Sequence, residues 1–292
     1  MRRRIAGLAA LALLASCGRT PPPGPEPRPR YVVGEGYSLG GQWSYPREDW
    51  SLDQAGIAEI MPRRSGLTAN GERHDATALV AAHRTLPLPS IVTVTNLENG
   101  RSLRVRVHDR GPERAGRVIA VSPRAAELLG ARGLFQARVT ADQGASRLAG
   151  SGLEGHAPAL AIATAPVGRV ERESLAAPEG ARVAAPRAET IRPAVATEAA
   201  ATASPPERLP EQVTQGVPMP GRLWVEAGSF FRADFARTQA ARLGMRAEPF
   251  GLPGRQQVWR VRGGPYATLP EADEAFARAL RAGQQDLRLV VE

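Results

Sequence analysis

The sequence contains no lysine, so all 38 of its basic residues are arginines, and they stand against 29 acidic residues. The formal net charge is +9 at pH 7. Nucleic-acid-binding proteins gather such an excess on one face or one helix. The arginines here follow no helix face, so their charge indicates solvated surface. We therefore expect no nucleic-acid partner.

Cysteine and histidine are also scarce, with one cysteine and 4 histidines in 292 residues. A single cysteine excludes an intrachain disulfide framework and any zinc or iron–sulfur site built from several cysteines. The histidines are scattered, which argues against a histidine-built metal site. We expect neither a metal nor a cofactor.

Aromatic residues make up 5% of the chain, and none occurs between Phe135 and Trp224. The middle of that interval is rich in alanine and proline and has no periodic apolar positions. Such a segment buries too little apolar surface to offset its chain entropy. We expect residues 143–218 to be a disordered linker between two small domains, at residues 31–142 and 219–292.

The N-terminus carries an export signal. Arg2, Arg3 and Arg4 precede an apolar run over residues 5–15, which is shorter than the roughly 20 residues that span a bilayer. We expect residues 1–16 to be a signal peptide. Residues 17–30 are proline-rich, which is typical of an extended spacer.

The end of this signal resembles the lipobox of bacterial lipoproteins, through Leu14-Ala15-Ser16-Cys17. The resemblance implies lipid attachment at Cys17. Gly18, where an aspartate would retain a lipoprotein in the inner membrane, implies an anchor on the periplasmic face of a Gram-negative outer membrane. The alternative is an ordinary signal peptide with an incidental cysteine.

Residues 31–142 show short strands and one short helix. Residues 90–97 alternate with β-branched side chains, Asn99-Gly100 suits a tight turn, and residues 101–107 return with Arg104 and Arg106 expected to face outwards. Further strands are expected at 117–121 and 133–140. Ser122 and Pro123 begin a helix that Gly130 ends. This pattern predicts a mainly β domain, a closed β-barrel.

Residues 219–292 have an α+β pattern. We expect strands at 223–229, 257–261 and 287–291 and helices at 233–243 and 271–281, in a small four-stranded ferredoxin-like sheet with its helices on one face. Alternation directs Val225, Ala227 and Val261 towards the helices. The open face then carries Trp224, Glu226, Arg260 and Arg262. Such a face suits a glycan; the alternative is a solvated sheet face with a surface tryptophan.

Four motifs follow one another in residues 68–112. They are Thr68-Ala69-Asn70-Gly71-Glu72, Ala81-Ala82-His83-Arg84-Thr85-Leu86-Pro87, Val94-Thr95-Asn96-Leu97 with Asn99-Gly100, and Asp109-Arg110-Gly111-Pro112. Together they resemble the rare lipoprotein A family, septal-ring lytic transglycosylases with a double-psi β-barrel. The resemblance implies endolytic cleavage of peptidoglycan strands stripped of stem peptides, with 1,6-anhydro-muramyl ends as products.

By the same resemblance, Glu72, His83 and Asp109 occupy the catalytic positions. Glycosidic cleavage needs an acid and a negative group near the developing positive charge. Glu72 is the expected acid, Asp109 the charge-stabilising group, and His83 the residue that orients Glu72 or the sugar. Each has an alternative: Glu72 as a solvated turn residue, His83 as a core histidine satisfied by backbone, and Asp109 as an Asx residue that caps a turn.

The chain also departs from the family pattern. Gly56-Ile57-Ala58-Glu59-Ile60-Met61-Pro62 stands where the family has Gly-Ile-Ala-Ser-Trp-Tyr-Gly, Ala120 replaces a common aspartate, and His108 replaces an asparagine. Sugars stack on aromatic faces. Trp43, Tyr45 and Trp50 either replace the lost pair or pack an N-terminal extension. A non-catalytic peptidoglycan-binding lipoprotein and an expansin-like barrel therefore stay open as alternatives to the enzyme.

The second unit contains two further motifs, Val225-Glu226-Ala227-Gly228-Ser229-Phe230 and Trp259-Arg260-Val261-Arg262-Gly263-Gly264-Pro265-Tyr266. They resemble the sporulation-related repeat (SPOR) domain, which usually has glutamine where this chain has Glu226. The resemblance implies binding to denuded glycan at the septum, with division proteins as further partners. The implied glycan-binding residues are Trp224, Glu226, Ser229, Arg260 and Arg262.

Overall fold

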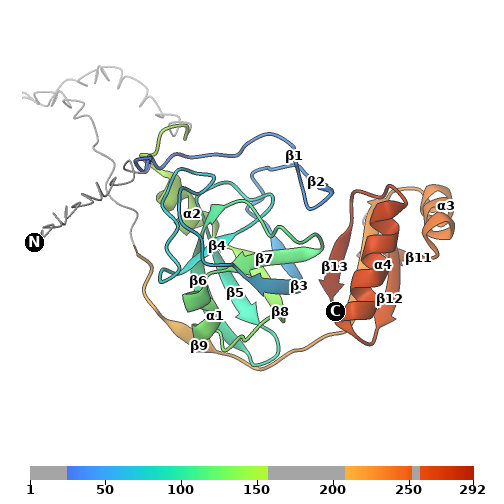
Figure 1. Cartoon of the computed structure of the whole chain (residues 1–292). Coiled ribbons are helices and arrows are strands. Elements are labelled where there is room, and N and C mark those ends of the chain that lie inside the picture. The colour runs from blue at the N-terminus through green and yellow to red at the C-terminus, as the bar shows by residue number, and fades with distance from the viewer. Residues whose placement is uncertain (1–24, 157–207, 252–256) are drawn as a thin grey trace, which may run out of the picture.

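The computed structural model describes residues 25–156, 208–251 and 257–292 (Figure 1). The expected signal peptide, Cys17 and most of the expected linker lie outside these residues. Within the described ranges, no helix has the length and apolar character that crossing a membrane would require.

The first unit is a closed β-barrel, as predicted. Its strands are paired in the order β3 (Asp53–Ile60), β7 (Arg117–Val121), β4 (Val80–Ala82), β6 (Arg101–Asp109), β5 (Ser90–Asn96) and β8 (Phe135–Ala141). Pairing of β3 with β8 closes the barrel. The β3–β7 and β4–β6 pairs are parallel, whereas β5 pairs antiparallel with both β6 and β8.

Alternating side chains of the β5–β6 hairpin fill the barrel. Val92, Val94, Leu103, Val105 and Val107 are at most 1% exposed. Gly100 takes a positive φ of 78° in the turn, as its sequence position indicates. The hairpin therefore follows the local pattern of the sequence closely.

Helix α1 (Pro123–Leu128) covers one end of this core. The Ser122 side chain accepts a hydrogen bond from the Ala125 amide and so begins the helix, as predicted. Ala125, Ala126 and Leu129 are buried against the barrel.

Both ends of the expected linker contact the barrel. Helix α2 (Gln143–Gly150) packs on β5, where the Ser146 hydroxyl bonds both the amide and the carbonyl of Ile91. Strand β9 (Val213–Gln215) pairs with β6. The predicted linker was thus too long, because one buried serine and backbone pairing hold these short segments without a periodic apolar pattern. Residues 157–207 lie outside the described ranges.

The second unit is a four-stranded antiparallel sheet with two helices on one face. Its strands are ordered β11 (Arg246–Phe250), β12 (Val258–Tyr266), β10 (Leu223–Phe230) and β13 (Arg288–Val291) in this described part of the chain. Helices α3 (Ala233–Leu243) and α4 (Leu269–Arg281) cover it. Val225, Ala227 and Val261 are fully buried with these helices, as the alternation predicted.

The two units meet where β13 lies beside β3 (Figure 1). Val290 of β13 pairs with Gly56 of β3, where a side chain would lie 2.8 Å from the Leu289 carbonyl oxygen. The side chain of Arg117 is 0% exposed, and its guanidinium donates to both carboxylate oxygens of Asp273 at 2.7 Å. The barrel residue Ile57 is buried in the apolar cluster of the second unit.

The N-terminal part of the first unit adds a small hairpin, β1 (Tyr37–Leu39) with β2 (Gln42–Ser44). Gln42 donates from its side-chain amide to the Leu287 carbonyl at 2.8 Å. The hairpin therefore also contacts the second unit.

Candidate active site

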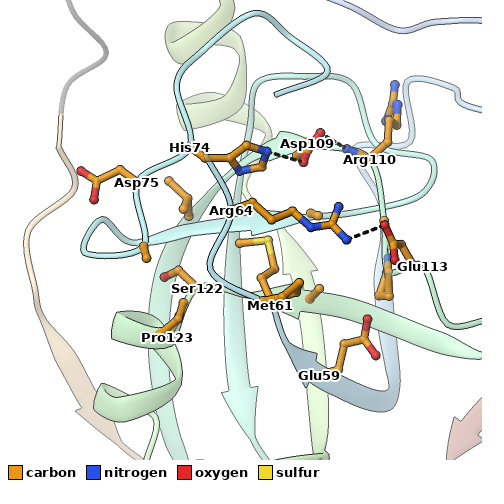
Figure 2. A pocket seen from close by; sticks show the side chains of 17 residues that line it. Glu59, Met61, Arg64, His74, Asp75, Asp109, Arg110, Glu113, Ser122 and Pro123 are labelled. Carbon is orange, nitrogen blue, oxygen red and sulfur yellow. Dashed lines mark hydrogen bonds and ion pairs between the residues drawn. The ribbon is translucent and has the colours of Figure 1, made fainter. Parts of the chain in front are cut away.

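A pocket opens where β3, β4, β6 and β7 come together (Figure 2). Asp109, the last residue of β6, lines it together with Arg110, His74 and the β3 residue Glu59. The remaining lining residues are Met61, Pro62, Arg64, Asp75, Ala76, Val80, Ala82, Gly111, Pro112, Glu113, Ala120, Ser122 and Pro123.

Asp109 is held in place by backbone amides. Its Oδ1 accepts hydrogen bonds from the amides of Ala69 and Arg110, each at 2.9 Å. Its Oδ2 lies 3.5 Å from Nε2 of His74. Oδ1 of Asp109 thus binds backbone amides, as the turn-capping alternative expects. Asp109 also lines the pocket.

The ring of His74 points towards Asp109, and both residues line the pocket (Figure 2). Burial lowers the pKa of His74 below its ordinary value, and the charge of Asp109 offsets this only in part. His74 is therefore a neutral partner for Asp109 near neutral pH.

Glu72 is buried, with 3% exposure, and is not among the described residues that line the pocket. The Arg106 guanidinium donates to its Oε1 from both Nη2, at 2.7 Å, and Nε, at 3.1 Å. Nδ1 of His108 lies 3.1 Å from its Oε2, and the Asn70 amide donates at 2.7 Å. Glu72 is therefore not a solvated turn residue. The prediction that Arg106 faces the solvent is also wrong, because the 68–74 loop covers this side of β6.

The contacts of Glu72 determine its charge. Burial alone would raise the pKa, but hydrogen bonds from His108 and Arg106, the Arg106 charge and the Asn70 bond together lower the pKa of Glu72 to about 2. A carboxyl group that is ionised at neutral pH has no proton to donate. The role of Glu72 as general acid therefore stays a prediction, and its buried contacts with Asn70, Arg106 and His108 favour a positioning role.

His83 is 4% exposed, and among the described residues no hydrogen bond or ion pair joins its ring to Glu72. Its Nδ1 accepts hydrogen bonds from the amides of Thr85, at 3.2 Å, and Leu86, at 3.1 Å. Burial, with the charges of Arg110 and Arg84, lowers the pKa of His83 to about 3. This arrangement matches the backbone-satisfied alternative for His83.

Arg110 connects the His83 turn with the pocket. Its guanidinium donates to the carbonyl of Leu86 at 2.5 Å and to that of Val33. Its own amide donates to Asp109. The turn that contains His83 is therefore joined to the pocket residue Arg110.

Sequence reasoning missed three residues of this site: His74, Arg106 and the bonding role of His108. One feature of the sequence indicated Arg106, because this charged residue lies in the most apolar part of a strand. His108 was noted only as a departure from the family pattern. His74 carried no signal beyond its position two residues after Glu72.

The expected glycan-binding residues do share one sheet face of the second unit. The Arg262 guanidinium stacks on Trp224 at 3.8 Å, and the Arg260 guanidinium stacks on Phe250 at 3.7 Å. Arg260 also pairs with Glu226 at 3.3 Å and lies opposite the exposed Ser229. Glu292 bridges the two arginines and was not foreseen.

Trp43 and Tyr45 form a stacked, exposed pair next to β2, with ring centroids 6.4 Å apart. The Trp43 amide donates to the Gln285 side chain of the second unit. Neither ring lines the pocket. The pair is thus an aromatic surface outside the pocket, and Trp50 is half-buried.

Across the ranges that the structure describes, no group of three or more histidine, cysteine, aspartate or glutamate residues could hold a metal ion.

We expect Glu72→Gln to destabilise the barrel at pH 7 by about 3 kcal/mol, because Arg106 would lose a buried charged partner. The folded-state pKa of Glu72 lies below the ordinary 4.5. Its contribution is therefore complete above pH 4.5 and is lost as the pH falls towards 2. Denaturant unfolding at several pH values measures this.

The stability curves of wild type and Glu72→Gln should converge at the acid end. Glu35→Gln, the same change at an exposed position, serves as the control and should match wild type throughout. Equal stability of Glu72→Gln and wild type at pH 7 would contradict the buried pair.

Comparison with known proteins supplies the family. A family model described as "Lytic transglycolase" matches residues 53–141, and the SPOR domain model matches residues 220–288. Two relatives named "Endolytic peptidoglycan transglycosylase RlpA" match most of the chain. The Pseudomonas aeruginosa PAO1 protein is 35% identical over 92% of this chain and 80% of its own length. The Escherichia coli K12 protein is 31% identical over 76% of this chain and 73% of its own length.

A solved structure of the RlpA SPOR domain from Pseudomonas aeruginosa is also similar, with 22% identity and a TM-score of 0.22, covering 24% of this chain and 99% of that one. The lytic transglycolase match covers the barrel and its pocket, and the SPOR match covers the sheet of the second unit. The chain belongs to the RlpA family of endolytic peptidoglycan transglycosylases.

Proposed function

We propose that this chain is an endolytic peptidoglycan transglycosylase, which cleaves peptide-stripped glycan strands at the division septum and leaves 1,6-anhydro-muramyl ends. The observation that carries this is the pocket around Asp109, which lies within the segment that matches the lytic transglycolase family.

The reaction needs a negative group beside the sugar carbon that becomes positively charged. Asp109 suits this role, because two amides fix one oxygen and His74 approaches the other. Fixed dipoles that need no rearrangement during the reaction are an effective form of transition-state stabilisation. His83, Arg110 and Glu72 hold the surrounding loops in place.

The loss of the Trp-Tyr pair favours a second function, a peptidoglycan-binding lipoprotein that does not cleave. The formed pocket and the family membership favour the enzyme. Product analysis separates the two.

We expect mature wild-type protein to produce glycan fragments with 1,6-anhydro-muramyl ends from amidase-treated, peptide-free glycan. Asp109→Asn should lower the rate by about 100-fold or more, because it removes the charge but preserves the shape. Chromatography and mass spectrometry of the products measure both. Asp286→Asn, at an exposed position of the second unit, should retain the wild-type rate. If wild type gives no anhydro product, the binding-only function is correct.

We also propose that the sheet face around Trp224, Arg260 and Arg262 binds the glycan. Stacked guanidinium and aromatic groups offer both hydrogen-bond donors and flat apolar surface to a sugar. The carboxylates of Glu226, Glu248 and Glu292 hold the two guanidinium groups in place.

Replacing both Arg260 and Arg262 by alanine should weaken binding to peptide-free sacculi about tenfold or more, since two donors and two stacked pairs are lost. Sedimentation with sacculi, in an Asp109→Asn background that slows cleavage, measures this. Replacing Arg278 and Arg281 on α4 removes the same charge from the helical face. Equal losses in both double variants would show that charge alone matters.

The anchor is the third part of the proposal. We infer that Cys17 carries the lipid and attaches the chain to the periplasmic face of the outer membrane, with division proteins nearby. The support is the sequence at Leu14-Ala15-Ser16-Cys17.

Cys17→Ala should leave the protein unprocessed or soluble, because the acyl chains would be its anchor. Membrane fractionation measures the distribution, with Ser16→Ala as a neighbouring control. Finding Cys17→Ala still in the outer membrane would contradict lipid anchoring.

A further inference from the structure

A row of four residues crosses the pocket from one carboxyl group to another. Glu59 on β3 is the register partner of Ala120 on β7, Ala120 is the partner of Ala82 on β4, and Ala82 is the partner of Asp109 on β6. All four line the pocket. Cross-strand partners present their side chains on one face of a sheet. Glu59 and Asp109 therefore lie at the two ends of this row, and the methyl groups of Ala120 and Ala82 lie between them.

The length of this row suits a sugar. Neighbouring strands lie about 4.8 Å apart, so three steps separate the outer backbones by at most about 14 Å in a flat sheet, and by less around a barrel. Both carboxyl side chains line the same pocket, which shortens the distance between them. Figure 2 shows Glu59 and Asp109 on separate sides of the pocket.

Glu59 differs from the other two acids in its bonding. Within the described residues, its carboxyl group takes part in no hydrogen bond or ion pair, whereas Glu72 and Asp109 are bonded to arginine or to amides. It is half-buried, and burial raises its pKa above the ordinary value. Such a group keeps its proton to higher pH than an exposed glutamate does.

The charges around Glu59 come from three directions. Arg117 and Arg114 act to lower its pKa, as does Arg84, while Glu113 acts to raise it. Asp273 of α4 pairs with Arg117 at 2.7 Å and with Arg114 at 3.5 Å, which offsets their positive charge.

The remaining charged groups of the pocket are partnered elsewhere. Glu113 is itself paired with Arg64 at 2.6 Å, and Asp75 with Arg208 at 2.7 Å. Among the pocket acids, Glu59 is thus the one placed to exchange a proton with a bound molecule.

We propose that Glu59 is the catalytic proton donor and acceptor of this enzyme, opposite Asp109. Glu59 has this role only if the chain cleaves glycan as proposed above. Its carboxylic acid gives its proton to the glycosidic oxygen as the bond from that oxygen to the muramyl C1 breaks. The resulting carboxylate then takes the proton of the muramyl 6-hydroxyl as that oxygen bonds to C1. Glu59 ends protonated, and no water or other reactant enters.

This role also accounts for two departures of the sequence from the family pattern. The pattern has serine at position 59 and aspartate at position 120, and this chain has Glu59 and Ala120. These positions are register partners on β3 and β7. At this step of the row, the family pattern has an acid on β7 at position 120, and this chain has one on β3 at Glu59.

The first test is Glu59→Gln in the full mature protein, assayed on peptide-free glycan. We expect a loss of anhydro products of about 100-fold or more, with unchanged sedimentation on sacculi and an unchanged unfolding midpoint. Glu35→Gln should match wild type.

The pH profile separates a proton donor from a structural residue. Wild-type kcat/KM should fall as the pH rises through the raised pKa of Glu59, because the donor loses its proton. The residual activity of Glu59→Gln should lack this fall. Wild type that makes no anhydro product overturns the proposed function; an active wild type with an equally active Glu59→Gln overturns only the role of Glu59.

The second test moves the acid back to β7. Glu59→Ser should be inactive, and Glu59→Ser combined with Ala120→Asp should recover at least about tenfold of the lost rate, since an acid again stands in the row. Recovery excludes misfolding as the cause of the loss. No recovery in a folded double variant overturns the exchange between the two strands.

Discussion

The buried ion pair between Glu72 and Arg106 is the constraint on which the site depends. Charges this deep in a protein cost several kcal/mol each unless they are paired and hydrogen-bonded. The Asn70 amide and His108 complete the pairing, so the 68–74 loop closes on β6 in one arrangement. That arrangement brings the Ala69 amide to Asp109 and carries His74 to the other side of the same carboxylate.

Three acids within one small region thus have different surroundings. Glu72 is ionised by arginine and histidine, Asp109 is bonded to two amides, and Glu59 has neither kind of partner. Pairs of groups whose surroundings separate their pKa values are how enzymes obtain an acid and a stabilising anion at the same pH. In the proposed mechanism, Glu59 is the acid and Asp109 the stabilising group, with two alanines between them.

The sequence predicted those elements whose signals are local. The β5–β6 hairpin, the Ser122 cap and the covered face of the second unit all follow from alternation and turn chemistry within a few residues. Arg106 was misjudged because alternation tells which side of a strand a residue occupies, but not which distant loop covers that side. His83 was assigned to catalysis from a motif, whereas its bonds to Thr85 and Leu86 depend on how its own turn folds. Glu59 stood out only as a departure, since register across four strands is not visible in sequence.

The pairing of β13 with β3 has a consequence for solubility. Strand β3 extends beyond β7, which pairs only from Ile57 onwards, and at Gly56 the strand β13 takes the place beside it. Each strand would otherwise present unpaired amides and carbonyls, which are templates for joining other chains into a larger sheet. The Arg117–Asp273 pair fixes this cover. The second unit therefore protects the barrel from self-association, and the barrel protects the second unit in the same way.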